Sequence, residues 1–225
     1  PYEIYSQIKP NPTIENVQTG VAAFKASGAD CIVAIGGGSS MDTAKAIGII
    51  IANPEFADVR SLEGVAPTKN KCVPIIAVPT TAGTGSEVTP YAILTNDEKE
   101  TKTSISNPAY FPKAAFLDGK YMLGLPRGTT VYTAIDAMSH AMEGMLSVRA
   151  GALTDALAKE SLRVLRGELP ALASGKLNEE DRDALLYAAT LAGMVIANTG
   201  TSAVHSMGYS LTYIHGAPHG RANGL

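Results

Sequence analysis

The chain contains no tryptophan, only two cysteines among its 225 residues, and few aromatic residues, 6% in all. Two cysteines are too few for a disulfide framework, so we expect Cys31 and Cys72 to be free, buried thiols in a reducing compartment. An excess of positive charge is also missing, because 18 lysines and arginines stand against 21 acidic residues. This balance excludes the basic footprint of a nucleic-acid-binding protein and gives no sign of a membrane-surface patch.

Long apolar runs are absent as well. The longest nearly apolar stretch, Ala184–Ala197, is interrupted by Thr190 and is too short to span a bilayer. No signal-peptide pattern begins at Pro1. We therefore expect a cytoplasmic protein whose partners include neither nucleic acid nor a membrane. With 45% hydrophobic residues, the chain can bury a sizeable core in one large domain or two small ones.

The first half of the chain alternates predicted strands and helices. After a strand-like Tyr2–Ile8, Thr13 is placed to cap a helix that runs to about Ser27. Residues Cys31–Ile35 form a short apolar run between turn residues, which is typical of a buried parallel strand. A helix at about Met41–Ala52 follows, so the pattern indicates an α/β fold.

A glycine-rich loop, Gly36–Ser40, joins that strand to that helix. Glycines let a backbone approach a phosphate closely, and the first N–H groups of a helix can bind an anion. The loop matches neither G-x-G-x-x-G nor a Walker pattern, so a tight turn without a ligand stays an alternative. Asp42 would repel a phosphate, so we expect it to orient the loop or cap backbone amides while Ser39 and the glycine amides face the ligand.

A second polar loop, Pro79–Glu87, follows another apolar run, Pro74–Val78, and contains three threonines, a serine and two glycines. Ligands of open α/β sheets bind at the carboxyl ends of the strands, so two such loops favour a ligand site more than either loop alone. Further strands are expected at Val88–Leu94, Thr101–Ser106 and Ala114–Asp118, the first two joined by a turn at Asn96-Asp97.

One predicted helix, Thr129–Ser147, carries Asp136 and His140 four residues apart, so both side chains project from one face. Together they can hold a divalent metal ion. His205 and His219 lie downstream, at a spacing that a helix and a turn can bridge. One aspartate with three histidines suits Fe(II), Zn(II), Mn(II) or Co(II) better than Ca(II) or Mg(II). The alternative is a helix-packed Asp–His hydrogen bond beside unrelated surface histidines.

After Leu125-Pro126 the pattern becomes helical only. Besides the helix with Asp136, three more are expected, at about Ala152–Arg166, from a cap at Asn178 to about Asn198, and from about Ser202. We therefore predict a boundary near residue 125 between an α/β half and an all-helical half, with the site between the two halves.

Four motifs in this order resemble those of the iron-containing (group III) alcohol dehydrogenases, in particular the lactaldehyde/propanediol oxidoreductase-like branch. They are Gly36-Gly-Gly-Ser-Ser-Met-Asp-Thr-Ala-Lys45, the loop Pro79–Thr89, Asp136-x3-His140, and His205-x13-His219-Gly220. The similarity covers essentially the whole chain. It implies a partial Rossmann-like NAD(P)-binding α/β domain at residues 1–125 and a helical metal-binding domain at residues 126–225. It also implies a chain cut at both ends, with a βαβ segment missing before Pro1 and helices missing after Leu225.

The resemblance also assigns roles to single residues. The metal ligands would be Asp136, His140, His205 and His219. The dinucleotide would contact three residues in each of the two polar loops, and two further residues would lie near its adenosine and ribose parts. These are Gly37, Gly38 and Ser39, then Thr80, Thr81 and Thr84, and finally Asn11 and Lys102. One departure concerns Tyr209, because some members carry a histidine one turn after the third ligand.

Three further residues are candidates for supporting roles in the chemistry. Glu143 follows His140 by three positions on the same helix face and is expected to orient that imidazole, with a solvated helix glutamate as the alternative. A proton must reach or leave the substrate oxygen, and His215 titrates near neutrality, so we assign it the relay. Tyr209 is assigned a positioning or packing role, and the alternative is that both residues merely line the cleft.

The predicted function is an NAD(P)-dependent alcohol dehydrogenase or aldehyde reductase with Fe²⁺, and Zn²⁺ as the other metal to consider. It would transfer hydride between the nicotinamide of NAD or NADP and a short-chain alcohol or aldehyde. We expect a homo-oligomer, a dimer. Two alternatives stay open: a zinc enzyme similar to glycerol dehydrogenase or dehydroquinate synthase, and a truncated metal-binding domain without turnover.

Overall fold

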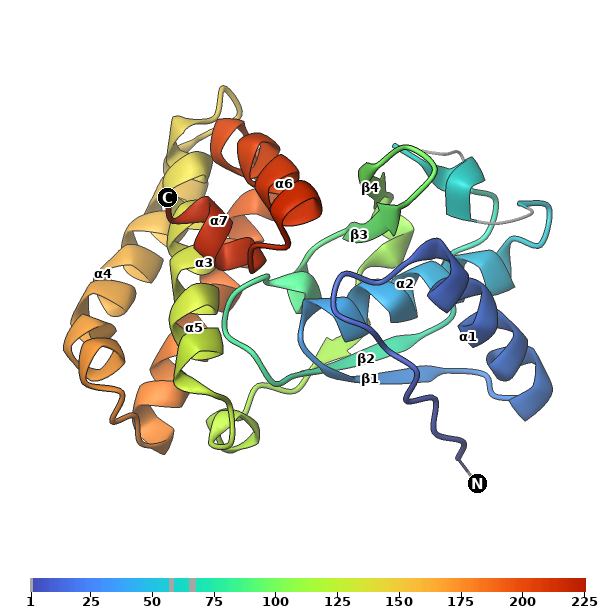
Figure 1. Cartoon of the computed structure of the whole chain (residues 1–225), viewed down its shortest axis with the longest axis horizontal. Coiled ribbons are helices and arrows are strands. Elements are labelled where there is room, and N and C mark those ends of the chain that lie inside the picture. Colours follow the sequence, from blue (N-terminus) through green and yellow to red (C-terminus); the bar gives the residue numbers. More distant parts are fainter. Residues whose placement is uncertain (1, 57–58, 65–67) are drawn as a thin grey trace. The chain divides into compact units, whose positions relative to one another are not determined.

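The structure is a computed structural model that describes residues 2–56, 59–64 and 68–225 (Figure 1). It divides into two compact units, each with its own buried core. The first comprises Pro1–Val78 with Pro90–Phe116, and the second comprises Pro79–Thr89 with Leu117–Leu225. The predicted fold class is confirmed, because a parallel sheet lies in the first unit and the second is mostly helical. The predicted domains, 1–125 and 126–225, stay a prediction.

The first unit is built on a three-stranded sheet in the order β1-β2-β5, in which β2 and β5 are parallel. The strands are β1 (Ile32–Gly36), β2 (Ile75–Pro79) and β5 (Ala114–Ala115). Two helices, α1 (Ile14–Ser27) and α2 (Gly38–Ala52), lie side by side next to this sheet (Figure 1). Their apolar side chains form the core of the unit with inward residues of the strands, such as Ala34, Ile75 and Ala77.

The ends of α1 follow the predicted signals. The Thr13 hydroxyl accepts a hydrogen bond from the Asn16 N–H, and Gly28 ends the helix with φ +66°. Helix α2 begins at Gly38, three residues earlier than predicted, so the glycine-rich loop is itself the first turn. Gly37 at the N-cap has no side chain to bond the first amides of the helix.

The predicted hairpin is confirmed as strands β3 (Tyr91–Asn96) and β4 (Thr101–Ser106), paired antiparallel from Tyr91 opposite Ser106 to Asn96 opposite Thr101. Among the described residues before β5 there are also three short 3₁₀ turns, η1 (Val59–Leu62), η2 (Ser86–Val88) and η3 (Pro108–Tyr110). The η2 turn ends at Val88, where the first strand of the hairpin was predicted to begin, and β3 begins three residues later.

Two predictions for this unit are wrong. Tyr2–Ile8 is not a strand, because it joins neither sheet among the described residues; instead the Tyr5 hydroxyl donates to the Asn16 carbonyl of α1. Cys31 is exposed rather than buried, since it lies in the connection before β1. Cys72 is buried and free, as predicted, and burial raises the pKa of its thiol to about 12.

The second unit contains five α-helices in the described chain, preceded by the 3₁₀ turn η4 (Gly119–Met122). They are α3 (Arg127–Leu146), α4 (Ala152–Ser174), α5 (Glu179–Thr199), α6 (Ala203–His215) and α7 (His219–Asn223). Helix α4 runs past its predicted end and through Pro170 to Gly175, which adopts φ +72°. Helix α5 begins with the predicted cap at Asn178, which forms a capping box with Asp181.

The loop Pro79–Thr89 belongs to this second unit although its sequence continues β2. Gly85 has φ +62°, and a Cβ at that position would lie 2.5 Å from the Gly193 Cα of α5, so only glycine allows this approach. The Thr190 hydroxyl of α5 donates a 3.0 Å hydrogen bond to the buried Glu87 carboxylate. The polar loop is therefore anchored to the helices by backbone packing and by a buried hydrogen bond.

Over the described residues, no single helix is both long and apolar enough to cross a membrane. Helices α5 and α6 reach the required length and apolar character only as a pair, bent by 108° at the break between them.

Candidate metal centre

Helix α3 presents three polar side chains on one face, because Asp136, His140 and Glu143 are spaced by four and by three residues. All three are buried, with 3 to 4% of their surface exposed. Ionisable groups are rarely buried this far unless they are paired or bind a metal. This face of the helix therefore needs partners from elsewhere in the second unit.

Helices α6 and α7 supply those partners. The His205 Nε2 atom lies 3.5 Å from Asp136 Oδ1, and the His219 Nε2 atom lies 3.6 Å from the same oxygen. The rings of His140 and His205 stack, with centroids 4.6 Å apart. The four residues predicted from the sequence thus converge on one place.

Two glycines allow this convergence. Gly216, with φ +63°, ends α6 and lets the chain turn toward α7. A Cβ on Gly220 would lie only 1.9 Å from the Tyr132 carbonyl oxygen, so a larger residue could not bring α7 this close to α3. His219, at the start of α7, is thereby held beside Asp136.

The geometry fits a metal ion. Two ligand atoms that each lie about 2.1 Å from a tetrahedral ion are about 3.4 Å apart. The distances of 3.5 and 3.6 Å agree with that separation, and ligand atoms of Asp136, His140 and His205 all lie within 4.8 Å of one another. That these residues bind a metal, and which metal, stays a prediction.

The electrostatics of the cluster also favour a cation. Burial would raise the pKa of Asp136, but the neighbouring histidines hold it well below its usual range. Burial lowers the pKa of His140, and Asp136 opposes this only in part. For His205 the carboxylates have the larger effect: burial would lower its pKa, but Asp136 and Glu143 together raise it. The raised pKa of His205 shows that the two carboxylates, Asp136 and Glu143, favour a positive charge beside this ring, which is the charge a metal ion would bring.

Glu143 does not orient the His140 ring as predicted. Its Oε2 atom bonds to His205 Nδ1 instead, because α6 enters the second unit beside the end of α3. Its Oε1 atom accepts hydrogen bonds from the Ser202 N–H and hydroxyl and from the Val204 N–H, at 2.9 to 3.0 Å. The carboxylate therefore connects a predicted ligand to the beginning of α6.

Asn223 is a residue that the sequence analysis missed. Its Nδ2 atom lies 2.8 Å from Asp136 Oδ1, 3.1 Å from His205 Nε2 and 3.3 Å from His219 Nε2. Gly208 makes room for it, since a Cβ there would lie 2.1 Å from the Asn223 Oδ1 atom. The available signal was its spacing of four residues from His219, which places both on one face of α7.

The two residues assigned to proton transfer lie in different surroundings. Tyr209 stacks on the His219 ring with centroids 5.7 Å apart and meets His205 edge-on. His215 is exposed in the last turn of α6, ten residues along the helix from His205. Tyr209 is thus in contact with two predicted ligands, whereas the relay role of His215 stays a prediction.

The predicted coenzyme residues fall in both units. Gly37, Gly38 and Ser39 form the half-buried start of α2 in the first unit. Thr80, Thr81 and Thr84 are half-buried in the loop of the second unit, where the Thr84 hydroxyl accepts a hydrogen bond from the Ser86 N–H. Their contact with a dinucleotide stays a prediction.

Asn11 and Lys102 are brought together in the first unit. Lys102 Nζ donates a 2.8 Å hydrogen bond to Asn11 Oδ1, across 91 residues of chain. Asp42 accepts a 3.0 Å hydrogen bond from a backbone amide, as expected, and this amide is that of Ile93 in β3.

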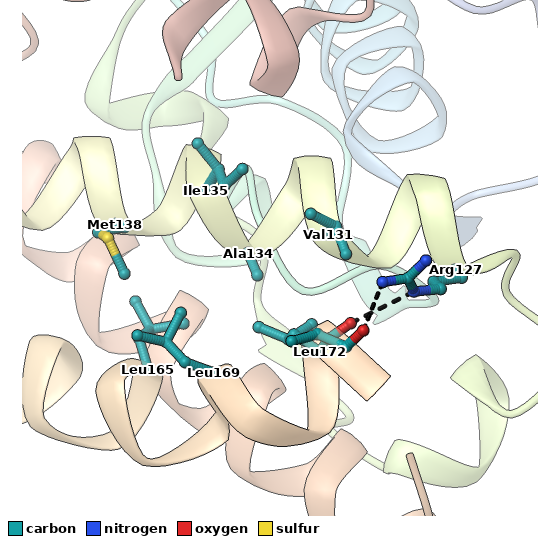
Figure 2. A pocket seen from close by; sticks show the side chains of 9 residues that line it. Arg127, Val131, Ala134, Ile135, Met138, Leu165, Leu169 and Leu172 are labelled. Carbon is teal, nitrogen blue, oxygen red and sulfur yellow. Dashed lines mark hydrogen bonds between the residues drawn. The ribbon is translucent and has the colours of Figure 1, made fainter. Parts of the chain in front are cut away.

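A separate hollow of about 230 Å³ lies between α3 and α4 (Figure 2). Its α3 wall includes Val131, Ala134 and Met138, which lie roughly opposite Asp136 on the helix because successive residues turn by about 100°. Arg127 closes one end by donating to the carbonyls of Leu172 and Ala173. The hollow is therefore distinct from the metal-ligand face.

Comparison with known protein families supports this geometry. Residues 1–119 match the family described as "Iron-containing alcohol dehydrogenase", and residues 130–225 match "Fe-containing alcohol dehydrogenase family, C-terminal". The chain is 45% identical over 224 residues to the lactaldehyde reductase of Escherichia coli (strain K12), covering 100% of this chain and 58% of that relative.

Solved structures give the same result. An iron-containing alcohol dehydrogenase from Thermotoga maritima matches with TM-score 0.91 and 40% identity, over 99% of this chain and 60% of that one. A sulfoacetaldehyde reductase from Bifidobacterium kashiwanohense, in complex with NAD+, matches with TM-score 0.89 and 34% identity, over 97% of this chain and 58% of that one. The chain thus spans about three fifths of the length of these relatives.

Proposed function

The chain belongs to the iron-containing alcohol dehydrogenase family, and from this premise we propose that it forms the coenzyme- and metal-binding part of an NAD(P)-dependent alcohol dehydrogenase or aldehyde reductase. The observation that carries the proposal is the convergence of Asp136, His140 and His205 in the second unit, with His219 beside Asp136 at 3.6 Å. When bound, a divalent ion would act as a Lewis acid toward an alcohol or carbonyl oxygen, and a nicotinamide would carry the hydride.

The four ligands would hold Fe²⁺, with Zn²⁺ as the competing ion. Three imidazoles and one carboxylate suit either metal, so the donor set alone does not choose between them. The family membership supports iron.

The start of α2 would hold the coenzyme pyrophosphate. Gly37 and Gly38 offer backbone N–H groups at a helix N-terminus, and the Ser39 hydroxyl adds a donor. The three threonines of the loop Pro79–Thr89 would bind another part of the same dinucleotide. Asn11 and Lys102, already hydrogen-bonded to each other, would meet the adenosine and ribose parts of NAD or NADP.

The substrate oxygen also needs a proton donor or acceptor. We assign this relay to His215, because histidine is the side chain most often used for proton transfer in enzymes, and a positioning role to Tyr209. The contacts of Tyr209 with the rings of His205 and His219 support the second assignment. Replacing His215 with glutamine should lower kcat mainly on the alkaline side, and an unchanged pH–rate profile would remove it from the mechanism.

The test of the whole proposal is an assay with NADH or NADPH and short aldehydes, including lactaldehyde, beside a metal analysis of the same sample. Coenzyme oxidation that requires bound iron would support the proposal. Bound zinc with glycerol oxidation would instead support the glycerol dehydrogenase-like alternative. Metal binding without turnover, in a sample that also binds NADH, would limit the function of this chain to binding. Size-exclusion chromatography of the same sample tests the proposed homodimer.

A substitution at Gly38 tests the proposed coenzyme site separately. Gly38→Val should weaken NADH binding about tenfold or more, because a side chain at the first turn of α2 blocks the approach of a phosphate to the amides. The metal content should be unchanged. NADH affinity equal to that of the wild type would contradict the proposed pyrophosphate site.

A further inference from the structure

Glu143 joins two features of the second unit that are usually separate, a predicted metal ligand and a helix start. Its side chain is 3% exposed and makes four hydrogen bonds among the described residues. Three are accepted by Oε1 from the Ser202 N–H, the Ser202 hydroxyl and the Val204 N–H. The fourth joins Oε2 to His205 Nδ1.

The direction of that fourth bond follows from chemistry. An ionised carboxylate can only accept hydrogen bonds, and the three N–H and O–H donors that converge on Oε1 are the surroundings of an ionised carboxylate. The proton between Glu143 and His205 must therefore lie on His205 Nδ1. A neutral imidazole with its proton on Nδ1 has a lone pair on Nε2.

A second contact agrees with this tautomer. Asn223 Nδ2 must be a donor, because it lies 2.8 Å from the Asp136 carboxylate oxygen, and the same nitrogen lies 3.1 Å from His205 Nε2. His205 Nε2 thus faces a donor on the side of the cluster and accepts from it. The Asp136 carboxylate oxygen lies farther from His205 Nε2, at 3.5 Å, so the shortest contact at each ring nitrogen favours the same arrangement.

We propose that Glu143 is a positioning residue that fixes the Nδ1–H tautomer of His205 and so keeps its Nε2 lone pair directed at the metal-ligand cluster. This rests on the proposed function, since it assumes that the cluster binds metal. Glu143 does not touch the other reacting groups and acts through His205 alone. Partners of this kind at a ligand histidine typically change metal affinity by 10- to 100-fold.

The competing explanation is that Glu143 only caps the first turn of α6. Glu143→Gln separates the two roles, because an amide has one oxygen where the carboxylate has two. If that oxygen keeps the three donors of Ser202 and Val204, the amide NH₂ faces His205 Nδ1. An NH₂ group can only donate, so His205 must then carry its proton on Nε2, where it blocks a metal.

The experiment has two readouts on wild type, Glu143→Gln and Glu143→Ala. The tautomer of His205 is read from its ring ¹⁵N shifts in metal-free protein, for each variant at a pH above the end of the ring's own titration, where the imidazole is neutral. The wild type should show Nδ1–H, Glu143→Gln should shift to Nε2–H, and Glu143→Ala should lose the preference. Co²⁺ titrations, followed by the visible absorption of the bound ion, should show a 10- to 100-fold lower affinity in both variants.

Amide hydrogen exchange in the first turn of α6 measures the capping role separately. Protection there should survive in Glu143→Gln and fall in Glu143→Ala. If Glu143→Gln keeps both the wild-type tautomer and the wild-type Co²⁺ affinity, the positioning role is overturned and capping alone remains.

The control is Glu160→Gln, which makes the same chemical change at an exposed glutamate paired with Arg163. It should leave the tautomer, the exchange and the Co²⁺ affinity unchanged. A wild-type protein that binds no Co²⁺ would contradict the proposed function. The ring ¹⁵N shifts of metal-free protein would still decide whether Glu143 sets the tautomer.

Discussion

Helices α2 and α3 both bury polar side chains, but they satisfy them in different ways. In α2, Asp42 accepts a 3.0 Å hydrogen bond from the Ile93 N–H, and the fully buried Lys45 donates a 2.8 Å hydrogen bond to the Tyr91 carbonyl. Both partners are backbone groups of β3. In α3, Asp136 and His140 face other side chains, two further histidines.

The difference lies in the balance of donors and acceptors. Around α2 an acceptor meets a donor and a donor meets an acceptor, so each group is satisfied by the fold itself. Around α3 a carboxylate and three imidazoles bring acceptor atoms together, and besides the donor Asn223 such a group is stabilised by protons or by a metal ion among them. Complementary buried polar groups therefore indicate structure, whereas converging acceptors indicate a binding site.

The largest effect should come from removing a ligand. His205→Ala should lower metal affinity by more than about 100-fold, beyond the effect of an indirect partner, because the variant loses a donor atom from the cluster. Metal content after purification and a Co²⁺ titration measure this. His215→Ala, which changes an exposed histidine of the same helix, should keep its metal. Full metal content in His205→Ala would show that the acceptors converge for another reason.

Breaking the complementary pair of α2 should affect stability instead. Lys45→Met should lower the free energy of unfolding by about 2 kcal/mol, because the Tyr91 carbonyl loses a buried donor. Urea denaturation measures this, with Lys25→Met as the exposed control, for which we expect a change below about 0.5 kcal/mol. The metal affinity of Lys45→Met should match that of the wild type. A specific loss of metal in the folded variant would contradict the separation between the two helices.

A smaller effect is expected for Asn223→Ala. Asn223 donates to Asp136 Oδ1, so its removal frees the carboxylate to rotate, and metal affinity should fall about tenfold. Asn198→Ala is the matched control, because the exposed Asn198 donates a hydrogen bond to the Met194 carbonyl of its own helix. If both variants bind Co²⁺ as the wild type does, Asn223 fills space beside Gly208 and does not orient Asp136.

The smallest effect concerns Cys72, which contacts the Lys45 carbonyl of α2. Burial raises its pKa to about 12, so the thiol stays neutral in the folded protein while it ionises in the unfolded chain above about pH 9. The contribution of the Cys72 thiol to the free energy of unfolding is therefore fully present below about pH 9 and is lost as the pH rises toward 12. We expect the free energy of unfolding of the wild type to fall by about 1 kcal/mol between pH 9 and 10. Cys72→Ala should lack this fall, whereas Cys31→Ala, which changes an exposed thiol, should retain it. Urea denaturation at each pH measures this, and an equal fall in the wild type and in Cys72→Ala would refute the role of the buried thiol.

Much of the fold was predictable from short patterns. Thr13 and Gly28 bound α1 as expected, and the apolar runs around Ala34 and Ala77 became β1 and β2. The hairpin turn after Asn96 was also predicted correctly. The ends of elements were less predictable: α4 continues through Pro170, since its packing against α3 and α5 outweighs the lost backbone hydrogen bond.

The sequence by itself determined which residues could form the metal centre. A spacing of four on one helix puts Asp136 and His140 on a common face whatever surrounds them, because the helical period is local. The structure then brought His205 and His219 to that face, in agreement with the prediction.

Only the tertiary structure decided which neighbours each side chain meets. Glu143 shares the face of His140, yet it bonds to His205, because the contact depends on where α6 begins relative to α3. Asn223 joins Asp136 across 87 residues of chain, through the close approach that Gly220 permits. Such contacts depend on how helices pack, and helix packing is set by the whole buried surface rather than by any local pattern.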